Sequence, residues 1–366
     1  FKMNITIENI DALNAVVKVD IAKDDYSDKV EKILTDYRKT ANIPGFRKGH
    51  VPASLIRKKY RTPVLVEEIN KMIQEKLNSY ITEEDLNLLG NPLPKEQEEI
   101  DLIQQACSIT EKGFKRILGF VKPGVMEYEI EAEYMHEFLR NRSKGFAYTP
   151  IVGSGYNACV LHYIGNNQEC KAGDMLLMDV GAEYANYSSD MTRTIPVSGR
   201  FTNRQKAVYN AVNRVKDAAT NMLMPGTLWA EYHKEVGKVM TSELLDLKLI
   251  DKADVQNEDP NWPAYKKYFM HGTSHHMGLD THDYGALKTP MKANMVFTVE
   301  PGIYIPEGSP CDEKWWGIAV RIEDCILVTK RGPVNYSAMA PRHPDEIEEL
   351  MKEESILNAF SLPTLD

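Results

Sequence analysis

The stretch Phe269–Asp283, which reads FMHGTSHHMGLDTHD, holds four of the chain's nine histidines together with two aspartates. Ordinary solvated surface rarely needs imidazole groups at this density. Histidine is a common metal ligand and changes its charge near neutral pH. The stretch therefore predicts a site that binds a metal or moves protons.

Two pairs of acidic residues flank this stretch. Asp179 and Asp190 lie upstream in LLMDVGAEYANYSSDMTRT, and Glu300 and Glu323 lie downstream in FTVEPGIY and VRIEDC. Together with one histidine, these acids offer hard oxygen ligands and a single imidazole. Such a set suits a pair of divalent ions such as manganese, cobalt or zinc better than it suits a metal that prefers thiolates.

The local sequence around these acids also favours a metal centre. Two strand-like segments joined by the turn-rich GAEYANYSSD predict a hairpin that places Asp179 and Asp190 side by side. The glutamates belong to the strand-like segments around Met295–Val299 and Ile318–Val328, where an unpaired charge amid apolar neighbours would cost roughly several kcal/mol. A single acid would be read as a surface charge or a structural ion pair, but the whole set indicates bound ions.

Four motifs carry a resemblance to a known family. In order along the chain, MDVGAEYANYSSDMTRT, HGTSHHMGLDTHD, TVEPGIY and VRIED resemble the motifs of the pita-bread metallopeptidases, and among these aminopeptidase P and prolidase. The resemblance covers roughly residues 100–354 and includes the upstream TPIVGSGYNACVLHY. It implies an α+β catalytic domain with the pita-bread fold of creatinase and the aminopeptidases.

The resemblance also implies a metal centre of two divalent ions per chain, with manganese as the first candidate and cobalt or zinc as alternatives. Asp179 would bind one ion, His275 and Glu300 would bind the other, and Asp190 and Glu323 would bridge both. A metal-bridging hydroxide would then hydrolyse the amino-terminal Xaa-Pro peptide bond. The expected substrates are peptides with proline at the second position.

Further residues would act beside the metals. The resemblance implies that Glu300 also carries a proton from the nucleophile to the leaving amine, and that His162, His271 and His282 contact the substrate or stabilise the transition state. Arg321, two residues before Glu323, would pair with a ligand carboxylate through its forked guanidinium.

A basic stretch near the start runs against the overall charge of the chain. Residues 38–61 hold eight lysines or arginines and no acid, whereas the net charge is −9. At its centre, NIPGFRKGHVP predicts an exposed loop that presents Phe46 beside Arg47 and Lys48. Basic side chains beside an exposed aromatic suit RNA phosphate and a protein pocket. For an isolated patch, a solvated basic face is the simpler interpretation.

This stretch also resembles a known family. PGFRKGHVP, preceded by the strand-like NAVVKVDI and a helical pattern near residues 24–41, is similar to the ribosome-binding amino-terminal domain of trigger factor, a bacterial chaperone. The resemblance covers residues 3 to about 99. It implies that Phe46, Arg47 and Lys48 contact protein and RNA beside the ribosomal exit tunnel.

Length and composition agree with two domains. A chain of 366 residues exceeds what one core usually serves, and a segment with two prolines and a glycine, LNLLGNPLPKEQEE, separates two helical patterns, the second of which begins at Asp101. Further along, Thr202 is expected to cap a helix whose apolar face is formed by Val208, Val212, Val215, Ala219 and Met222, and which ends before Pro225 and Gly226. The stretch 251–268 is polar and contains proline, so it is predicted to be a loop. We expect a trigger-factor-like domain over residues 1–99, a catalytic domain over 100–355 and a tail over 356–366.

No segment reaches eighteen consecutive apolar residues, so we expect a cytoplasmic chain with no membrane or DNA partner. Association of two such chains into a homodimer is also compatible with the sequence.

Two families in one chain predict a composite or fused protein. Neither resemblance extends over a whole member of its family, which favours a composite chain over a natural fusion that brings a peptidase to the ribosome. Two functions compete: a dinuclear metallo-aminopeptidase, which we rank first because it names bond-breaking chemistry, and a ribosome-docking chaperone module with the peptidase part as its fusion partner.

Overall fold

The chain divides into two compact units, Phe1–Leu88 and Leu89–Asp366. The structure, a computed structural model, describes residues 4–9, 15–40, 51–57, 61, 64–65, 95–260, 262–283, 285 and 289–353. The loop residues Phe46, Arg47 and Lys48 lie outside the described part. Helix α3 (Gln97–Leu118), which spans the boundary expected after Glu99, lies in the second unit.

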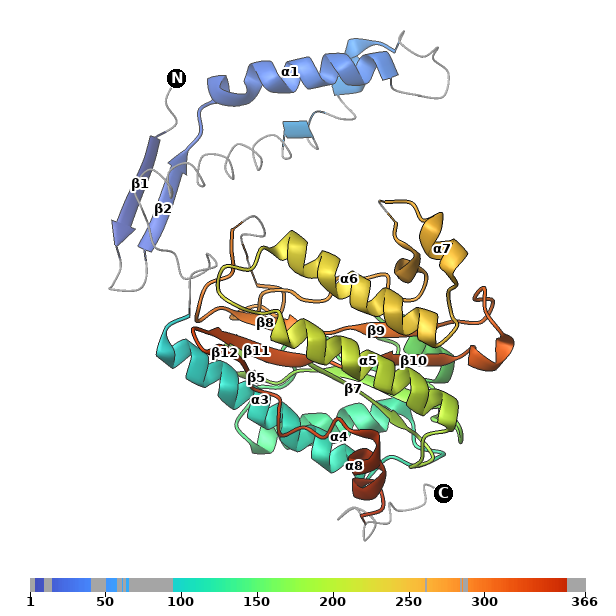
Figure 1. Ribbon diagram of the computed structural model, residues 1–366. Coiled ribbons are helices and arrows are strands. Elements are labelled where there is room, and N and C mark those ends of the chain that lie inside the picture. Colours follow the sequence, from blue (N-terminus) through green and yellow to red (C-terminus); the bar gives the residue numbers. More distant parts are fainter. Residues whose placement is uncertain are drawn as a thin grey trace, which may run out of the picture. The chain divides into compact units, whose positions relative to one another are not determined.

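The first unit begins with an antiparallel hairpin followed by a helix (Figure 1). Strand β1 (Asn4–Asn9) pairs with β2 (Ala15–Asp20), and α1 (Lys23–Thr40) follows. The strand and helix predicted here from NAVVKVDI and the following pattern are confirmed. Val30 and Leu34 of α1 form a small core with three residues that follow the helix in the chain, namely Val51, Ile56 and Val64.

The second unit is built on antiparallel strands between pairs of helices (Figure 1). One sheet has the order β3-β4-β7, with β3 (Ile151–Ser154), β4 (Met175–Val180) and β7 (Met191–Pro196). A second has the order β12-β11-β8, with β8 (Val296–Val299), β11 (Asp324–Thr329) and β12 (Gly332–Asn335). The remaining strands form two pairs, β9 (Gly302–Ile305) with β10 (Ile318–Arg321), and β5 (Glu183–Tyr184) with β6 (Tyr187–Ser188).

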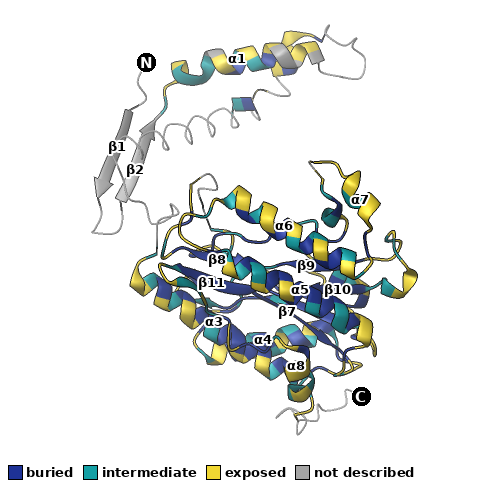
Figure 2. Ribbon diagram, in the orientation of Figure 1, coloured by how far each residue is buried: buried dark blue, intermediate teal, exposed yellow. Residues whose placement is uncertain are grey.

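Two helix pairs cover these strands. Helix α3 contacts β5 and β6 and packs with α4 (Glu127–Arg140), whereas α5 (Asn203–Asn221) contacts β8, β9 and β10 and packs with α6 (Trp229–Asp246). Two shorter helices are α7 (Lys252–Gln256) and α8 (Pro344–Leu350). Figure 2 shows buried residues alternating with exposed ones along the helices, as expected for helices with one face on a core.

Helix α5 shows how local sequence sets these elements. Thr202 caps its start: the backbone N–H of Gln205 donates to Thr202 Oγ1 over 3.3 Å, and the Thr202 N–H donates to Gln205 Oε1 over 2.8 Å. Val208, Val212, Val215 and Ala219 of the predicted apolar face are buried and Met222 is partly buried, and the helix ends before Gly226, whose φ of 94° favours glycine. This helix was predicted with its cap.

Three predictions of secondary structure need correction. Helix α3 starts at Gln97 rather than Asp101, because Glu96 and Glu99 form a capping box ahead of the apolar pattern. The segment 251–268, predicted as a loop, contains α7 and a 3₁₀ turn at Ala264–Lys267. The strand predicted over 318–328 is broken after Arg321, so that Glu323 lies between β10 and β11.

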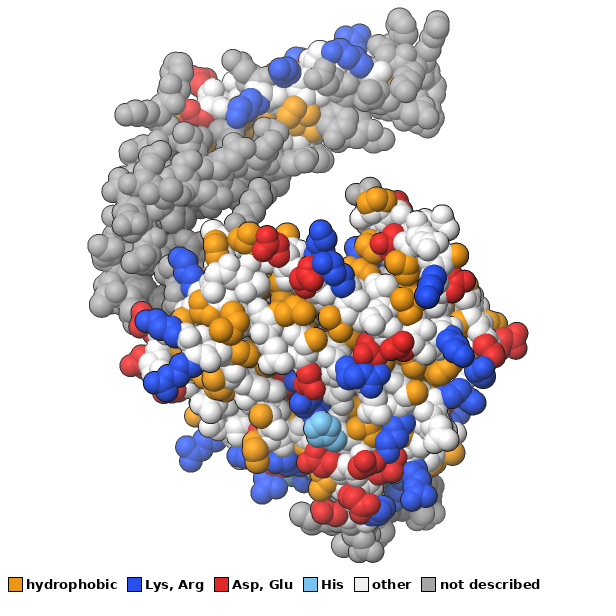
Figure 3. Space-filling model, viewed as in Figure 1, with side chains coloured by type: hydrophobic (Ala, Val, Ile, Leu, Met, Phe, Trp, Pro, Cys, Tyr) orange, Lys and Arg blue, Asp and Glu red, His pale blue; other side chains and the backbone are white. Residues whose placement is uncertain are grey.

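Charged side chains are mixed over the face of the second unit that is in view. Figure 3 shows lysine and arginine interspersed with aspartate and glutamate there, so the acidic excess does not gather on this face. No helix in the described part of the chain combines the length and apolar character that a bilayer span requires.

Candidate active site

The two aspartates reach the site from adjacent strands, as the hairpin prediction required. Asp179 lies near the end of β4, opposite Thr192 of β7, and Asp190 immediately precedes β7. The turn between β5 and β6 contains Ala185 and Asn186 at positive φ, 51° and 70°, as in a tight hairpin turn. This hairpin returns the chain so that both carboxylates lie at the same end of the sheet.

The two glutamates come from a second pair of strands. Glu300 directly follows β8 and Glu323 directly precedes β11, and the ladder pairs Val299 with Asp324. The N–H of Glu323 donates to the carbonyl of Thr192 over 3.0 Å, which links the two sheets. Four acids from separate motifs therefore meet at one junction.

His275 is held against β8 by its backbone. Its N–H donates to Thr298 Oγ1 over 3.1 Å, and its carbonyl accepts the Thr298 N–H over 3.0 Å. The ring Nδ1 lies 3.0 Å from the carbonyl of His276, so it carries the proton in the neutral ring and leaves the Nε2 lone pair facing the carboxylates. Nε2 is 3.4 Å from Asp190 Oδ2 and 3.7 Å from Glu300 Oε1.

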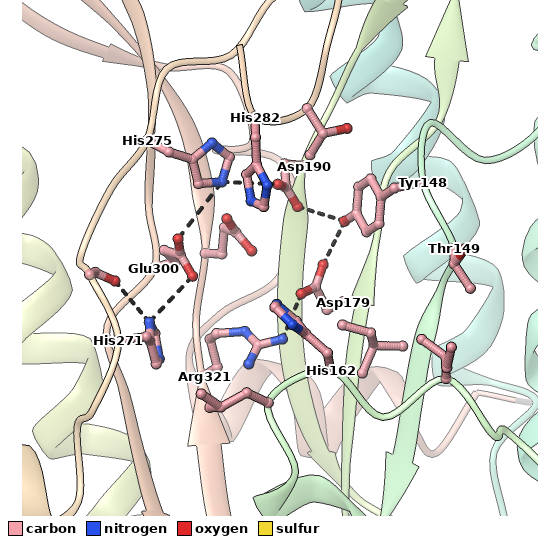
Figure 4. Close-up of a pocket in the computed structure, with 16 residues that line it drawn as sticks. Tyr148, Thr149, His162, Asp179, Asp190, His271, His275, His282, Glu300 and Arg321 are labelled. Carbon is pink, nitrogen blue, oxygen red and sulfur yellow. Dashed lines mark hydrogen bonds and ion pairs between the residues drawn. The ribbon is translucent and has the colours of Figure 1, made fainter. Parts of the chain in front are cut away.

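These residues line one cavity of about 450 Å³, drawn in Figure 4. Its wall brings together every residue predicted as a metal ligand or as catalytic: Asp179, Asp190, His275, Glu300, Glu323, His162, His271, His282 and Arg321. Ligand atoms of Asp190, His275 and Glu323 lie within 4.8 Å of one another. The arrangement is compact enough for these three groups to share one cation.

The charges of the cavity do not balance within the protein. Arg321 is the only lysine or arginine among the described residues of the wall, against four carboxylates, and its NH2 lies 2.6 Å from Asp179 Oδ2. Burial and the neighbouring carboxylates raise the pKa of Glu323 well above its usual value, and burial raises the pKa of Glu300 to about 8. A set of oxygen donors with excess negative charge fits divalent cations.

Burial and the charges of the cavity also shift the pKa values of its histidines. Burial would lower the pKa of His275, but its bond to Asp190 and the charges of Asp190 and Glu300 outweigh burial and raise that pKa to about 9. Burial and then the charge of Arg321 lower the pKa of His271 to about 3, which keeps this ring neutral. The ring of His282 stands perpendicular to that of His275, with 4.4 Å between their centres.

Sequence reasoning missed three residues of this site. The hydroxyl of Tyr148 lies 2.5 Å from Asp179 Oδ1 and 2.6 Å from Asp190 Oδ1, although it has one proton to donate. The Tyr304 hydroxyl accepts from Arg321 NH1 over 2.8 Å and lies 2.8 Å from His271 Nε2.

The third missed residue is Thr192, which connects Arg321 to Glu323. Its Oγ1 donates to Glu323 Oε2 over 2.7 Å and accepts from Arg321 Nε over 3.1 Å. Tyr304 and Thr192 stand inside the quoted motifs, in EPGIY and in DMTRT, and Tyr148 directly precedes TPIVG. Proximity to a motif was the available signal.

His276, next to a predicted ligand, does not line the cavity. Its buried ring stacks on Trp229 with 5.7 Å between centres and 8° between planes. It also contacts Phe297. This histidine packs the other side of the segment that presents His275.

Comparison with family models finds two matches. Residues 101–330 match the model of metallopeptidase family M24, and residues 3–148 match that of the bacterial trigger factor protein. The two matches overlap over residues 101–148. Both resemblances predicted from sequence motifs are confirmed, and so is the combination of two families in one chain.

Individual proteins resemble the second unit. The chain is 40% identical to the Xaa-Pro aminopeptidase of Escherichia coli over 261 residues, which are 70% of this chain and 59% of that protein. It is 40% identical to the Haemophilus influenzae Xaa-Pro aminopeptidase over 263 residues, 71% of this chain and 61% of that protein. The chain thus spans about three fifths of the length of these curated relatives.

Solved structures of aminopeptidases P are also similar to this chain. Proline aminopeptidase P II from Yersinia pestis is similar with a TM-score of 0.66 and 37% identity, over 71% of this chain and 61% of that one. Aminopeptidase P from E. coli with the inhibitor Pro-Leu is similar with a TM-score of 0.67 and 39% identity, over 71% of this chain and 60% of that one. The predicted pita-bread fold is confirmed, and because the family model matches more than half of the chain, the protein belongs to metallopeptidase family M24.

Proposed function

We propose that the second unit is a metal-dependent aminopeptidase that hydrolyses the bond between a peptide's first residue and a proline in second position. The observation that carries this proposal is the cavity lined by four carboxylates, four histidines and one arginine. The relatives at 40% identity, named Xaa-Pro aminopeptidases, support the substrate class.

The metal centre we propose holds two divalent ions, with manganese first and cobalt or zinc as alternatives. Asp179 would hold one ion, His275 and Glu300 the other, and Asp190 and Glu323 both. Such ions supply a hydroxide nucleophile near neutral pH and polarise the scissile carbonyl. The hard oxygen donors and the excess of negative charge in the cavity fit this assignment.

The chain's own groups would orient the reacting parts. Arg321 fixes the carboxylate of Asp179 and, through the Tyr304 hydroxyl, the ring of His271. Glu300 lines the cavity 3.6 Å from His271 Nδ1, where it can pass a proton toward the leaving amine. His162 and His282 line the same cavity and would contact the substrate.

The decisive experiment couples metal analysis to peptide turnover. Protein loaded with manganese, cobalt or zinc is incubated with Xaa-Pro dipeptides, longer Xaa-Pro peptides and Met-Ala-Ser. We expect release of the first residue from Xaa-Pro peptides, lost on chelation and restored by metal. Ready cleavage of Met-Ala-Ser with every Xaa-Pro peptide ignored would reject the substrate class. A fully loaded protein that cleaves no peptide would reject the activity.

A second candidate function is suggested by the match of residues 3–148 to the model of the bacterial trigger factor protein. We propose that the basic loop docks the first unit on the ribosome beside the exit tunnel, with Phe46 as aromatic anchor and Arg47 and Lys48 directed at phosphate. This role would place the chain in the cytoplasm. Alanine at all three positions should abolish co-sedimentation with large ribosomal subunits and leave peptide turnover unchanged.

Salt provides the control for this docking. Association should weaken as salt rises, because phosphate contacts release condensed counterions. If the triple variant sediments with ribosomes as the unaltered protein does, the loop is a solvated basic face. If turnover alone falls, the division of labour between the two parts is wrong.

A further inference from the structure

The loop Gly278–Asp283 brings His282 to the wall of the cavity. Its backbone is tied to neighbouring segments: the N–H of Ser188 donates to the Gly278 carbonyl over 2.8 Å, and the N–H of Asp283 donates to the His276 carbonyl over 3.0 Å. These bonds hold the two ends of the loop. The side chain of His282 lies between them, with its ring against His275.

One ion pair fixes the far end of this loop to a distant part of the chain. Lys95 Nζ lies 2.7 Å from Asp283 Oδ2, and the two side chains are only 13% and 9% exposed. The residues are 188 positions apart in sequence. Lys95 is itself anchored, since its N–H donates to the carbonyl of Asn294 over 2.8 Å. Asp283 is thus paired with a lysine whose backbone is held by a hydrogen bond to Asn294.

The ion pair packs directly against the loop backbone. A Cβ added at Gly278 would lie 2.2 Å from Lys95 Nζ and 2.1 Å from Asp283 Oδ2, so any larger residue there would displace both groups. Because both side chains are largely shielded from water, the attraction between the two charges is less screened than in an exposed pair. By contrast, the Lys206–Asp345 pair has an aspartate that is 86% exposed.

We propose that Lys95 is a positioning residue for His282. By holding Asp283, the residue that follows His282, Lys95 keeps the ring in its perpendicular contact with His275 and directed at the cavity. Lys95 lies directly before the capping box of α3, where the chain enters the described part of the second unit. The effect on turnover rests on the proposed peptidase function, whereas the effect on the ring does not.

Kinetics with matched variants test the first part. Lys95→Met should lower kcat for an Xaa-Pro peptide about tenfold or more, with a smaller change in KM and full metal content, and Lys95→Arg should restore most of the loss. Lys206→Met, which breaks the exposed pair, should leave kcat unchanged. In a His282→Gln background, Lys95→Met should cause no further loss, because its effect passes through that ring. An equal loss in both backgrounds would overturn the proposal.

An NMR measurement tests the second part without catalysis. The imidazole nitrogen signals of His282, identified by their loss in His282→Gln, should shift in Lys95→Met and stay in place in Lys206→Met. If Lys95→Met does not fold, the double variant Lys95→Met, Asp283→Asn, which removes both charges of the pair, is measured instead. Unchanged His282 signals would overturn the proposal whatever the turnover. A wild-type protein that cleaves no peptide would instead reject the proposed function, and the NMR result would still decide the role of Lys95.

Discussion

Two clusters of buried charge meet at consecutive residues, Glu323 and Asp324. Asp324 lies among cationic side chains of the protein, and we call this group the balanced cluster. Glu323 lies among other carboxylates, and we call this group the unbalanced cluster. Asp324 lies 2.6 Å from Arg193 NH2, is paired with Lys216 Nζ and accepts from Asn335 Nδ2 over 2.7 Å. Arg193, Lys216 and Asp324 are all at most 1% exposed. Although burial opposes it, the two cations hold the pKa of Asp324 well below its usual range.

Glu323 has the same burial and a contrasting environment. It shares the cavity with three other carboxylates, and Arg321 alone among the described wall residues carries a fixed positive charge there. Its pKa is raised by burial and by those neighbours. Burial by itself therefore does not distinguish a structural acid from a functional one. The difference lies in the cations around each acid: the protein itself supplies two beside Asp324, whereas the proposed metal ions would supply those that the cavity acids lack.

The largest expected effect comes from replacing Asp190, the residue of the unbalanced cluster that we propose binds both metal ions. Asp190→Ala should lose both metal ions and reduce Xaa-Pro hydrolysis to background, because Asp190 would contact both ions. Elemental analysis and turnover on the same sample measure this. Asp345→Ala, which removes an exposed carboxylate, serves as the control. Full activity in Asp190→Ala would show that the cavity acids are not the metal centre.

The balanced cluster should respond through stability. Asp324→Asn leaves Arg193 and Lys216 buried without their anion, which should lower the free energy of unfolding by roughly 3–5 kcal/mol. The exposed pair gives the comparison: Asp345→Asn should cost about 1 kcal/mol or less. Urea denaturation of the metal-free variants measures both. Equal losses would mean that the buried cluster is no more important to the fold than a surface pair.

Much of the unbalanced cluster could be predicted from sequence, and the balanced one could not. Asp179 and Glu300 stand next to apolar strand-like runs, so a charge there needs an explanation, and the motifs supply order and spacing. Nothing in TRT or RVKD marks Arg193 or Lys216 as fully buried, because their partner lies more than a hundred residues away. Ion pairs between residues so far apart in sequence become visible only once the fold brings them together.

The same limit explains the missed groups of the site. Tyr148 sits outside any strand or helix, and its two partners are 31 and 42 residues further along the chain. The prediction of short helices failed for another reason. Helix α7 lies in a stretch that was predicted as a loop because it is polar and contains proline, although Asp251 caps the helix by accepting the N–H of Asp254 over 2.8 Å. Caps predict where a helix starts only when a pattern follows.

Metal addition should raise stability through the unbalanced cluster alone. With manganese at about a hundred times its dissociation constant, the native state should gain about 2.7 kcal/mol. The melting temperature of the wild-type protein should therefore rise when chelator is replaced by manganese, and that of Asp190→Ala should stay constant. A similar rise in both proteins would place the stabilising ion elsewhere.

The smallest expected effect has the opposite sign for the two neighbours. In chelator, Glu323→Gln should increase the free energy of unfolding by about 1 kcal/mol near pH 8, whereas Asp324→Asn decreases it. The hydrogen bond from Thr192 Oγ1 to Glu323 Oε2, 2.7 Å long, can be kept by an amide oxygen, so the variant loses charge and little else.

The pH dependence of this difference follows from the raised pKa of Glu323. A carboxyl whose pKa is higher in the folded than in the unfolded protein contributes stability at low pH and loses it as pH rises through the folded pKa. The advantage of Glu323→Gln in chelator should therefore grow with pH and vanish toward acid. Manganese should reverse the order, since only the wild-type carboxylate would hold the ions. A Glu323→Gln protein that is destabilised in chelator as strongly as Asp324→Asn would show that the cavity acids are already balanced by the protein.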